Sequence, residues 1–150
     1  GAESWLRDGV TSPMQIVRHI VPDGREAVAA RLRELVEGGT DLILVTGGTG
    51  PAPRDQTPEA VADVAEKELP GFGEEMRRAS LAEVPTAILS RQTAVIRDAT
   101  LIITLPGKPA AIATCLNAVF AAVPYCLDLI GAARIDTDPA RIKAFRPKSA

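Results

Sequence analysis

The sequence predicts an α/β domain of three layers, in which helices cover both faces of a largely parallel central sheet. Two observations predict this class: short apolar runs alternate along the chain with segments of helical periodicity, and turn residues separate them. The length of 150 residues fits a single domain, residues 1–150, with a sizeable core. Aromatic residues make up only 3% of the sequence, so Ala, Val, Leu and Ile must build that core.

The first part of the sequence predicts a strand, a helix and a second strand. Residues 15–21 are rich in β-branched residues and lie between two prolines, which favours a strand. Asp23 is the predicted N-cap of the next helix, with Glu26 completing a capping box, and the helical periodicity ends at Gly38. Residues 42–45 form a continuous apolar run, as expected of a strand buried on both faces. Together these segments predict one βαβ unit.

The second part predicts two further helices and a pair of strands. A helix begins at Thr57, with Thr as N-cap and proline in the first turn, and ends near Glu68. A short helix is expected over residues 74–82. Residues 94–97 and 101–104 are typical of two strands joined by a three-residue turn.

A long uncharged segment, residues 109–127, has about the length of a membrane span. It is rich in Ala rather than Leu and also contains Thr114, Asn117 and Pro124. We therefore interpret it as a helix packed inside the protein, and we expect no membrane partner.

Net charge and cysteine content indicate which partners and which location to expect. A net charge of -2 provides no electrostatic footprint for nucleic acid. Cys115 and Cys126 lie in apolar sequence without CxxC spacing, which favours reduced, buried thiols and a cytoplasmic location. No signal peptide is recognisable at the start of the sequence. Four cations near the end are interpreted as a solvated tail: Arg141, Lys143, Arg146 and Lys148.

A glycine-rich loop directly follows the run at residues 42–45. Its glycines let backbone N–H groups approach an anion closely, and its threonine hydroxyls add donors. It lacks the Lys-Ser/Thr of a Walker loop and the spacing of a dinucleotide-binding GxGxxG motif. Three glycines among four residues favour a phosphate- or ligand-binding loop over an ordinary turn. This glycine loop consists of Thr46, Gly47, Gly48, Thr49 and Gly50.

Two acids follow predicted strands and are candidates for metal binding. Asp55 is open to two interpretations, a residue stabilised by the dipole at a helix N-terminus or a hard oxygen ligand for Mg²⁺ beside a phosphate loop. For Asp23 the capping box already supplies a structural explanation. Because both follow strands, neighbouring strand ends would bring them together, as a metal–nucleotide site requires.

Two further segments provide weaker signals. Pro106 and Gly107 lie in another strand-to-helix loop, where glycine permits close approach of a ligand. Ser90 and the adjacent Arg91 supply a hydroxyl and a cation ahead of the next strand. The sole histidine, His19, lies inside a predicted strand, so neither a histidine-assisted nucleophile nor a His/Cys zinc site can be assembled.

Taken in order, these motifs resemble the molybdenum-cofactor biosynthesis family over essentially the whole chain. The final block is similar to the dedicated bacterial adenylyltransferases of that family. The blocks that carry the resemblance are 46–51 (TGGTGP), 54–60 (RDQTPEA), 70–77 (PGFGEEMR), 84–91 (VPTAILSR), 105–109 (LPGKP) and 144–150 (AFRPKSA).

The resemblance implies a homotrimer of α/β subunits that joins AMP from ATP to the terminal phosphate of molybdopterin, with Mg²⁺ as cofactor and pyrophosphate as the second product. It makes Asp23 and Asp55 the two acids required for transfer and for the metal. The glycine loop, Glu74, Ser90 and the loop at 105–109 become walls of the nucleotide and pterin site. A molybdenum-insertion enzyme is the implied downstream partner.

Departures and alternatives accompany the resemblance. Thr104 stands where the family commonly has Asn, which puts a pterin contact in doubt, and Pro53 stands where Arg is common. Enzymes of molybdenum insertion carry a similar domain but need further domains. A non-catalytic trimeric pterin-binding or scaffold module of the same fold is the other alternative, and the presence of both Asp23 and Asp55 argues against it.

The resemblance also implies segments that this sequence does not contain. Family members begin with a strand, so we expect a first strand ahead of Gly1, between residues 15–21 and 42–45 in the sheet. A longer excursion is expected between Asn117 and Ala118. The apolar stretch at 110–130 is long for so small a domain, which suggests that part of its surface is buried between the subunits of the trimer.

Overall fold

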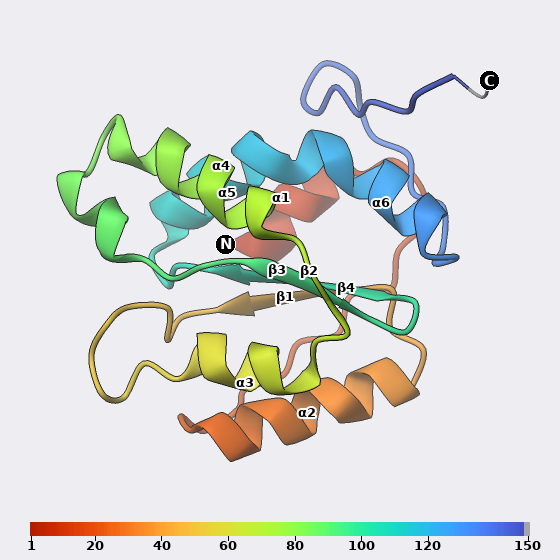
Figure 1. Cartoon of the computed structure of the whole chain (residues 1–150). Coiled ribbons are helices and arrows are strands. Elements are labelled where there is room, and N and C mark those ends of the chain that lie inside the picture. Colours follow the sequence, from red (N-terminus) through yellow and green to blue (C-terminus); the bar gives the residue numbers. More distant parts are fainter. Residues whose placement is uncertain (149–150) are drawn as a thin grey trace.

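The computed structural model describes residues 1–148, and it has the predicted three-layer α/β architecture (Figure 1). The strands are β1 (Leu42–Thr46), β2 (Lys67–Glu68), β3 (Ala94–Arg97) and β4 (Thr100–Leu105). The helices are α1 (Ala2–Gly9), α2 (Arg25–Glu37), α3 (Thr57–Val64), α4 (Pro70–Leu81), α5 (Pro109–Val119) and α6 (Val123–Leu129), with 3₁₀ turns η1 (Pro85–Leu89) and η2 (Phe120–Ala122). Ser149 and Ala150, the end of the last sequence block, lie outside the described residues.

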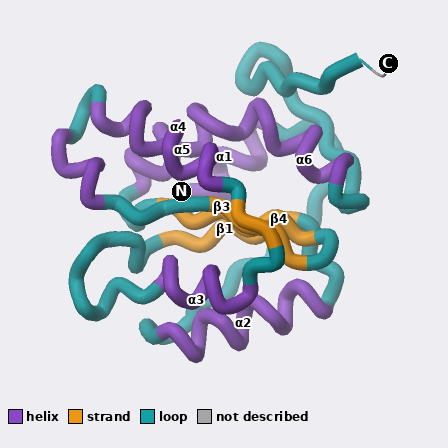
Figure 2. Tube along the Cα trace, viewed as in Figure 1, coloured by secondary structure: helices purple, strands orange, loops and turns teal. Residues whose placement is uncertain are grey.

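Helices cover both faces of the sheet (Figure 2). Helices α2 and α3 lie on one face, and α1, α4, α5 and α6 lie on the other. The central strand β4 supplies both cores in alternation: Ile102 packs with residues of α2 and α3, whereas Leu101 and Ile103 pack with residues of α5 and α6. Burial on both faces explains why every residue of β4 is apolar or a satisfied threonine.

The sheet is mixed, with strand order β1-β4-β3-β2. β1 pairs with β4 in parallel, from Leu42 opposite Leu101 to Thr46 opposite Leu105. β3 is antiparallel to β4 and to β2. Among the described strands, β1 and β4 form the parallel pair. The turn at Asp98, with φ of 50°, reverses the chain direction, so β3 and β4 are antiparallel.

The strand predicted at residues 15–21 is wrong. The segment is irregular, and Val17 and Ile20 are 62% and 91% exposed. Strand propensity needs a neighbouring strand to pair with, and no strand of the described chain pairs with this segment. The first member of the predicted βαβ unit is consequently absent, and His19 lies in an exposed loop. β1, at the edge of the described sheet, is only partly buried rather than buried on both faces.

The helices are largely as predicted, with two changed boundaries. α3 ends at Val64 rather than near Glu68, because Lys67 and Glu68 form β2 and pair with Ile96 and Val95 of β3. α4 begins at Pro70, four residues before the predicted start. Proline suits that position since it fits the first turn of a helix.

The apolar segment Pro109–Leu129 is long and apolar enough to cross a membrane by length and composition alone. In the structure it forms α5, η2 and α6 in succession, and its side chains build the core under one face of the sheet. The prediction of a helix packed inside the protein is therefore confirmed. The fully buried residues of the segment are Cys115, Leu116, Phe120, Val123 and Leu127.

Both cysteines are free thiols; Cys115 is buried as predicted, whereas Cys126 is only half-buried. Burial raises the pKa of Cys115 and of Cys126, so both are held protonated. α5 continues without interruption through Asn117 and Ala118. The longer excursion expected there in family members stays a prediction. The strand expected ahead of Gly1 lies outside the sequence and stays a prediction.

Candidate functional site

The glycine loop begins where β1 ends, and its conformation depends on glycine at two positions. Gly47 and Gly48 have φ of 89° and 68°, which side-chain-bearing residues rarely adopt. A Cβ on Gly48 would also lie 2.3 Å from Thr57 Oγ1. The Thr57 hydroxyl donates to the Gly47 carbonyl at 2.9 Å, so it fastens the loop to α3 instead of capping the helix as predicted.

The loop after β4 lies beside the glycine loop. The Gly47 N–H donates to the Leu105 carbonyl at 2.9 Å, and a Cβ on Gly107 would stand 3.8 Å from the Gly47 Cα. This neighbourhood follows from the parallel pairing of β1 and β4, since their carboxyl ends meet at one edge of the sheet. Pro106 and Gly107 therefore lie beside the glycine loop.

Asp55 is fixed by a tight turn at the end of the glycine loop. Its Oδ2 accepts the Ala52 N–H at 3.1 Å, while its own N–H donates to the Ala52 carbonyl at 2.9 Å. A Cβ on Gly50 would lie 2.7 Å from Oδ2, so glycine is needed for this approach. Within residues 1–148, no group donates to Oδ1. One carboxylate oxygen is thus committed to the turn and the other is free to bind a ligand.

Asp23 does not cap α2, so the predicted capping box is wrong. Gly24 occupies the N-cap position with φ of 131°, and no side chain caps it. The Arg25 N–H instead donates to Gln56 Oε1 at 2.8 Å. The exposed Asp23 carboxylate accepts no hydrogen bond from the described part of the chain, which removes the structural explanation for this acid.

The Arg25–Gln56 hydrogen bond also brings the two acids into one region. Asp23 lies two residues before Arg25, and Asp55 lies immediately before Gln56. A cavity of about 410 Å³ opens between these turns. The side chains and backbone of the following residues line it: Arg25, Pro51, Ala52, Pro53, Asp55, Gln56, Glu59 and Arg91.

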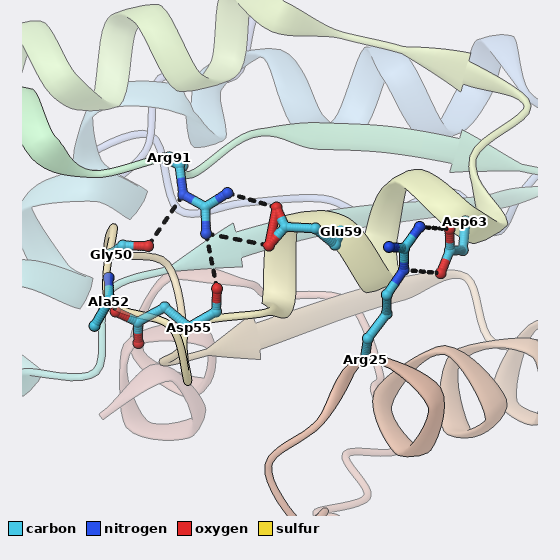
Figure 3. Close-up of polar contacts among 7 residues, drawn as sticks. All are labelled: Arg25, Gly50, Ala52, Asp55, Glu59, Asp63 and Arg91. Carbon is cyan, nitrogen blue, oxygen red and sulfur yellow. Dashed lines mark hydrogen bonds and ion pairs between the residues drawn. The ribbon is translucent and has the colours of Figure 1, made fainter.

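Two arginines organise the walls of this cavity (Figure 3). Arg91 pairs with Glu59 and also donates to backbone carbonyls of the glycine loop and of Asp55. Arg25 makes a bidentate pair with Asp63 at 2.6 Å. The adjacent guanidinium lowers the pKa of Glu59 and of Asp63, so both remain ionised near neutral pH.

Helix α4 supports the segment that carries Ser90. A Cβ on Gly73 would lie 2.3 Å from the Gln92 carbonyl oxygen, and Arg77 donates to that same oxygen at 2.7 Å. The Ser90 hydroxyl donates to Gln92 Oε1 at 2.9 Å. Glu74 is exposed on the first turns of α4, next to Gly73. The 70–77 block therefore shapes the segment at 90–92 by close packing.

The two departures from the family pattern have different surroundings. Thr104 is fully buried, and its hydroxyl accepts the Thr93 N–H at 2.7 Å and donates to the Thr93 carbonyl at 3.1 Å. It therefore extends the β3–β4 pairing and presents no group to the cavity. Pro53 lines the cavity with its ring, where Arg would have added a charge.

Only oxygen ligands are available for a metal in this region. In the residues that the structure describes, no group of three or more His, Cys, Asp or Glu side chains is arranged to hold a metal ion. Mg²⁺ usually keeps several waters and binds one or two carboxylates together with substrate phosphates. The free oxygen of Asp55 and the unbonded carboxylate of Asp23 fit that requirement.

Comparison with known proteins identifies the family. Residues 4–125 match the family model described as a probable molybdopterin binding domain of molybdenum-cofactor biosynthesis. The chain belongs to this family. The matched residues include the glycine loop, both acids, Ser90 and the loop after β4, so every predicted site residue falls within the match.

Two bacterial relatives of this chain carry the same name. The protein of Haemophilus influenzae is 49% identical over 161 positions, which cover 99% of this chain and 82% of the relative. That of Helicobacter pylori is 51% identical over 144 positions, covering 95% and 82%. Both are named molybdopterin adenylyltransferase. The alignment with the Haemophilus influenzae protein is longer than the 150-residue chain, so that relative has residues within the shared span that this chain lacks. The alignment with the Helicobacter pylori protein is shorter than the chain.

The fold is shared with a solved structure of the family. The molybdopterin biosynthesis Mog protein of Mycobacterium ulcerans superposes with a TM-score of 0.80 and 35% sequence identity, covering 87% of this chain and 83% of that one. The α/β class predicted from the sequence is therefore confirmed by the comparison as well as by the coordinates.

Sequence reasoning missed three residues that organise the site. Gln56 accepts a hydrogen bond at the start of α2, where Asp23 was predicted to cap the helix. Glu59 appeared only within the block at 54–60. Arg91 was noted as a cation without an assigned partner. Their partners lie 31 to 41 residues away in the sequence, so local spacing provided no signal for these contacts.

Proposed function

We propose that the protein is a molybdopterin adenylyltransferase, which joins AMP from ATP to the terminal phosphate of molybdopterin and releases pyrophosphate. The observation that carries the proposal is the meeting of the glycine loop, the Asp55 turn and the loop after β4 at one edge of the sheet. Relatives of that name, at 47–51% identity over nearly the whole chain, support it.

The glycine loop is the proposed phosphate cradle. Positive φ at Gly47 and Gly48 gives the loop a form in which glycine permits close approach of a phosphate to the backbone. The Gly47 N–H is bonded to the Leu105 carbonyl, so the cradle would use the N–H groups that follow it. The threonine hydroxyls of the loop, Thr46 and Thr49, were expected to add donors. Thr49 is buried and Thr46 is exposed, so Thr46 is the better placed of the two for a ligand in solvent.

Asp55 and Asp23 are the proposed metal-binding acids. Bound Mg²⁺ would neutralise phosphate charge and help align the reacting groups. Asp55 would hold it through the oxygen that the turn leaves free. Asp23 would approach from the turn at the start of α2. The hydrogen bond from the Arg25 N–H to Gln56 holds this turn beside the one that carries Asp55.

The reaction needs positioning more than covalent chemistry by the protein. An oxygen of the pterin's terminal phosphate attacks the α-phosphorus of ATP, the bond from that phosphorus to the bridging oxygen breaks, and pyrophosphate leaves. The chain contributes by binding both phosphates in line and by placing N–H dipoles where negative charge develops. Ser90, Glu74, Pro106 and Gly107 are the proposed walls for nucleotide and pterin.

The finer assignments belong to the same proposal. We expect a homotrimer in the cytoplasm, with the adenylated pterin passed to an enzyme of molybdenum insertion. The alternative of a non-catalytic pterin-binding scaffold is not favoured, because the chain covers 82–83% of relatives that are named as transferases.

The proposal is tested by incubating the protein with molybdopterin, ATP and Mg²⁺. Adenylated pterin and pyrophosphate are expected in equal amounts, measured by mass spectrometry and a coupled phosphate assay. Omitting the pterin provides the control for simple ATP hydrolysis. Pterin binding without either product would favour the scaffold alternative and overturn the proposal.

A further inference from the structure

Arg91 connects three segments that are far apart in the sequence (Figure 3). Its Nε donates to the Gly50 carbonyl at 3.0 Å, and its Nη2 donates to the Asp55 carbonyl at 2.7 Å. Its two terminal nitrogens donate to the Glu59 carboxylate at 2.5 and 3.1 Å. The Arg91 N–H donates to the Thr49 carbonyl at 2.8 Å. A guanidinium has five donors in a fixed plane, and Arg91 uses donors on all three of its nitrogens.

The turn that Arg91 holds has little support of its own. Residues 50–55 contain neither helix nor strand. Pro51 and Pro53 have no N–H to donate, so Ala52 supplies the hydrogen bond that orients the Asp55 carboxylate. Arg91 donates hydrogen bonds to the backbone at both ends of the turn, to the carbonyls of Gly50 and Asp55. It therefore controls the distance between the Ala52 N–H and the Asp55 carboxylate.

Glu59 makes Arg91 an anchor rather than a free cation. The pair is bidentate, and both side chains are only about a third exposed, at 39% and 35%. Each partner stabilises the charge of the other, which raises the pKa of Arg91 and lowers that of Glu59. A phosphate would therefore have to compete with Glu59 for a guanidinium that is already neutralised and aligned.

We infer that Arg91 is a positioning residue, which with Glu59 holds the turn at 50–55 so that the free oxygen of Asp55 is presented to the cavity. The inference rests on the proposed function only for its effect on turnover. The geometric part concerns the unliganded protein, because every contact in it lies within the chain.

The first test measures the turn directly. Arg91→Lys keeps the positive charge and Glu59→Gln keeps the side-chain shape, but neither variant can form the planar bidentate ion pair. Amide exchange of Ala52, followed by NMR without substrate or metal, is expected to accelerate in both variants. Arg78→Lys is the matched control, since Arg78 pairs with Glu75 on the exposed side of α4. Unchanged Ala52 exchange in both variants would overturn the inference.

The second test distinguishes positioning from direct phosphate binding. Misplacement of a reacting group costs up to about 10²-fold in rate, so kcat should fall on that scale in both variants while KM for ATP changes little. If Arg91 bound ATP directly, Arg91→Lys would raise KM, and Glu59→Gln would free the guanidinium and lower it. That result contradicts the inference. Altered exchange with an inactive wild-type protein would instead refute only the proposed function.

Discussion

The two acids of the candidate site are held in different ways. Asp55 has one oxygen bound by its own turn, whereas Asp23 is exposed and accepts no hydrogen bond from residues 1–148. An acid fixed on one side keeps its direction without a ligand, and an unrestrained acid must be ordered when the ligand binds. Asp55 is thus the preorganised partner of the pair, and Asp23 is the adaptable one.

Asp55→Asn should separate charge from shape. The amide oxygen can still accept the Ala52 N–H, so the turn is expected to survive. The free oxygen becomes an NH₂ group, which cannot bind a cation. Turnover should fall by about 10²–10³-fold while pterin binding remains, because charge stabilisation acts chiefly in the transition state. Steady-state kinetics and a pterin-binding titration measure the two effects, and full turnover would exclude the assigned role.

Asp23→Asn tests whether this acid acts in chemistry or in folding. Because Gly24 and Gln56 provide the start of α2, the substitution should change the free energy of unfolding by less than about 0.5 kcal/mol. Transfer activity should nevertheless drop strongly. Thermal unfolding and the transfer assay are measured on the same sample. A variant that unfolds early but stays fully active would show that Asp23 is structural.

Contacts between distant residues limit what spacing can predict at this scale. The glycine loop and Asp55 follow directly from residue types after a strand, and the structure brings them together. Gln56 and Arg91 could not be predicted, because their partners come from other elements of the fold. The capping box at Asp23 failed for the same reason, since a side chain from outside the helix supplied the acceptor.

Helices were predicted better than strands because their periodicity is local. α2 and α4 have the expected type and nearly the expected length. The segment at 15–21 has strand composition but lacks a paired neighbour in the described chain, and β2 ended α3 early by pairing with β3. Strand formation depends on partners that the local sequence does not specify.

Close packing of α4 against the segment at 90–92 provides a prediction for this helix. In Gly73→Ala the new Cβ would lie 2.3 Å from the Gln92 carbonyl oxygen, so the helix must move. Overpacking of this kind costs about 1–3 kcal/mol. Each kcal/mol lowers Tm by about 2–4 °C in a chain of this size. Activity should fall as well, since Ser90 follows the movement.

Gly71→Ala is the matched control in the same helix. No heavy atom lies within 4 Å of the position its Cβ would take, and alanine is the better helix former. We expect Tm unchanged or slightly raised and activity retained. Equal destabilisation of the two variants, measured by thermal unfolding, would contradict the proposed packing role of Gly73.

Considered as a whole, the domain places its site at one edge of the sheet, and a run of exposed apolar side chains directly precedes Ser90 in the sequence. The segment expected to supply the trimer interface, residues 110–130, packs largely into the core of its own subunit. Exposed apolar side chains gather instead on the end of α4 and on η1, in residues 81–89, the apolar patch. The members of this patch are Leu81, Val84, Ile88 and Leu89.

The apolar patch is the predicted subunit interface of the expected trimer. Ile88 and Leu89 are 70% and 53% exposed, and clusters of that kind mark interaction surfaces. The patch ends directly before Ser90, so a neighbouring subunit would border the candidate site. Ile88→Asp should dissociate the assembly and reduce activity, because a buried carboxylate at the interface would lack a partner.

Multi-angle light scattering at micromolar concentration measures this outcome for wild type, Ile88→Asp and the control Leu129→Asp. Leu129 is 67% exposed on α6, outside the apolar patch, so its substitution adds the same charge without the same effect. We expect three subunits in the wild type and control and one in Ile88→Asp. A monomeric wild type would refute the trimer, whereas a trimeric Ile88→Asp would move the interface to another surface of the domain.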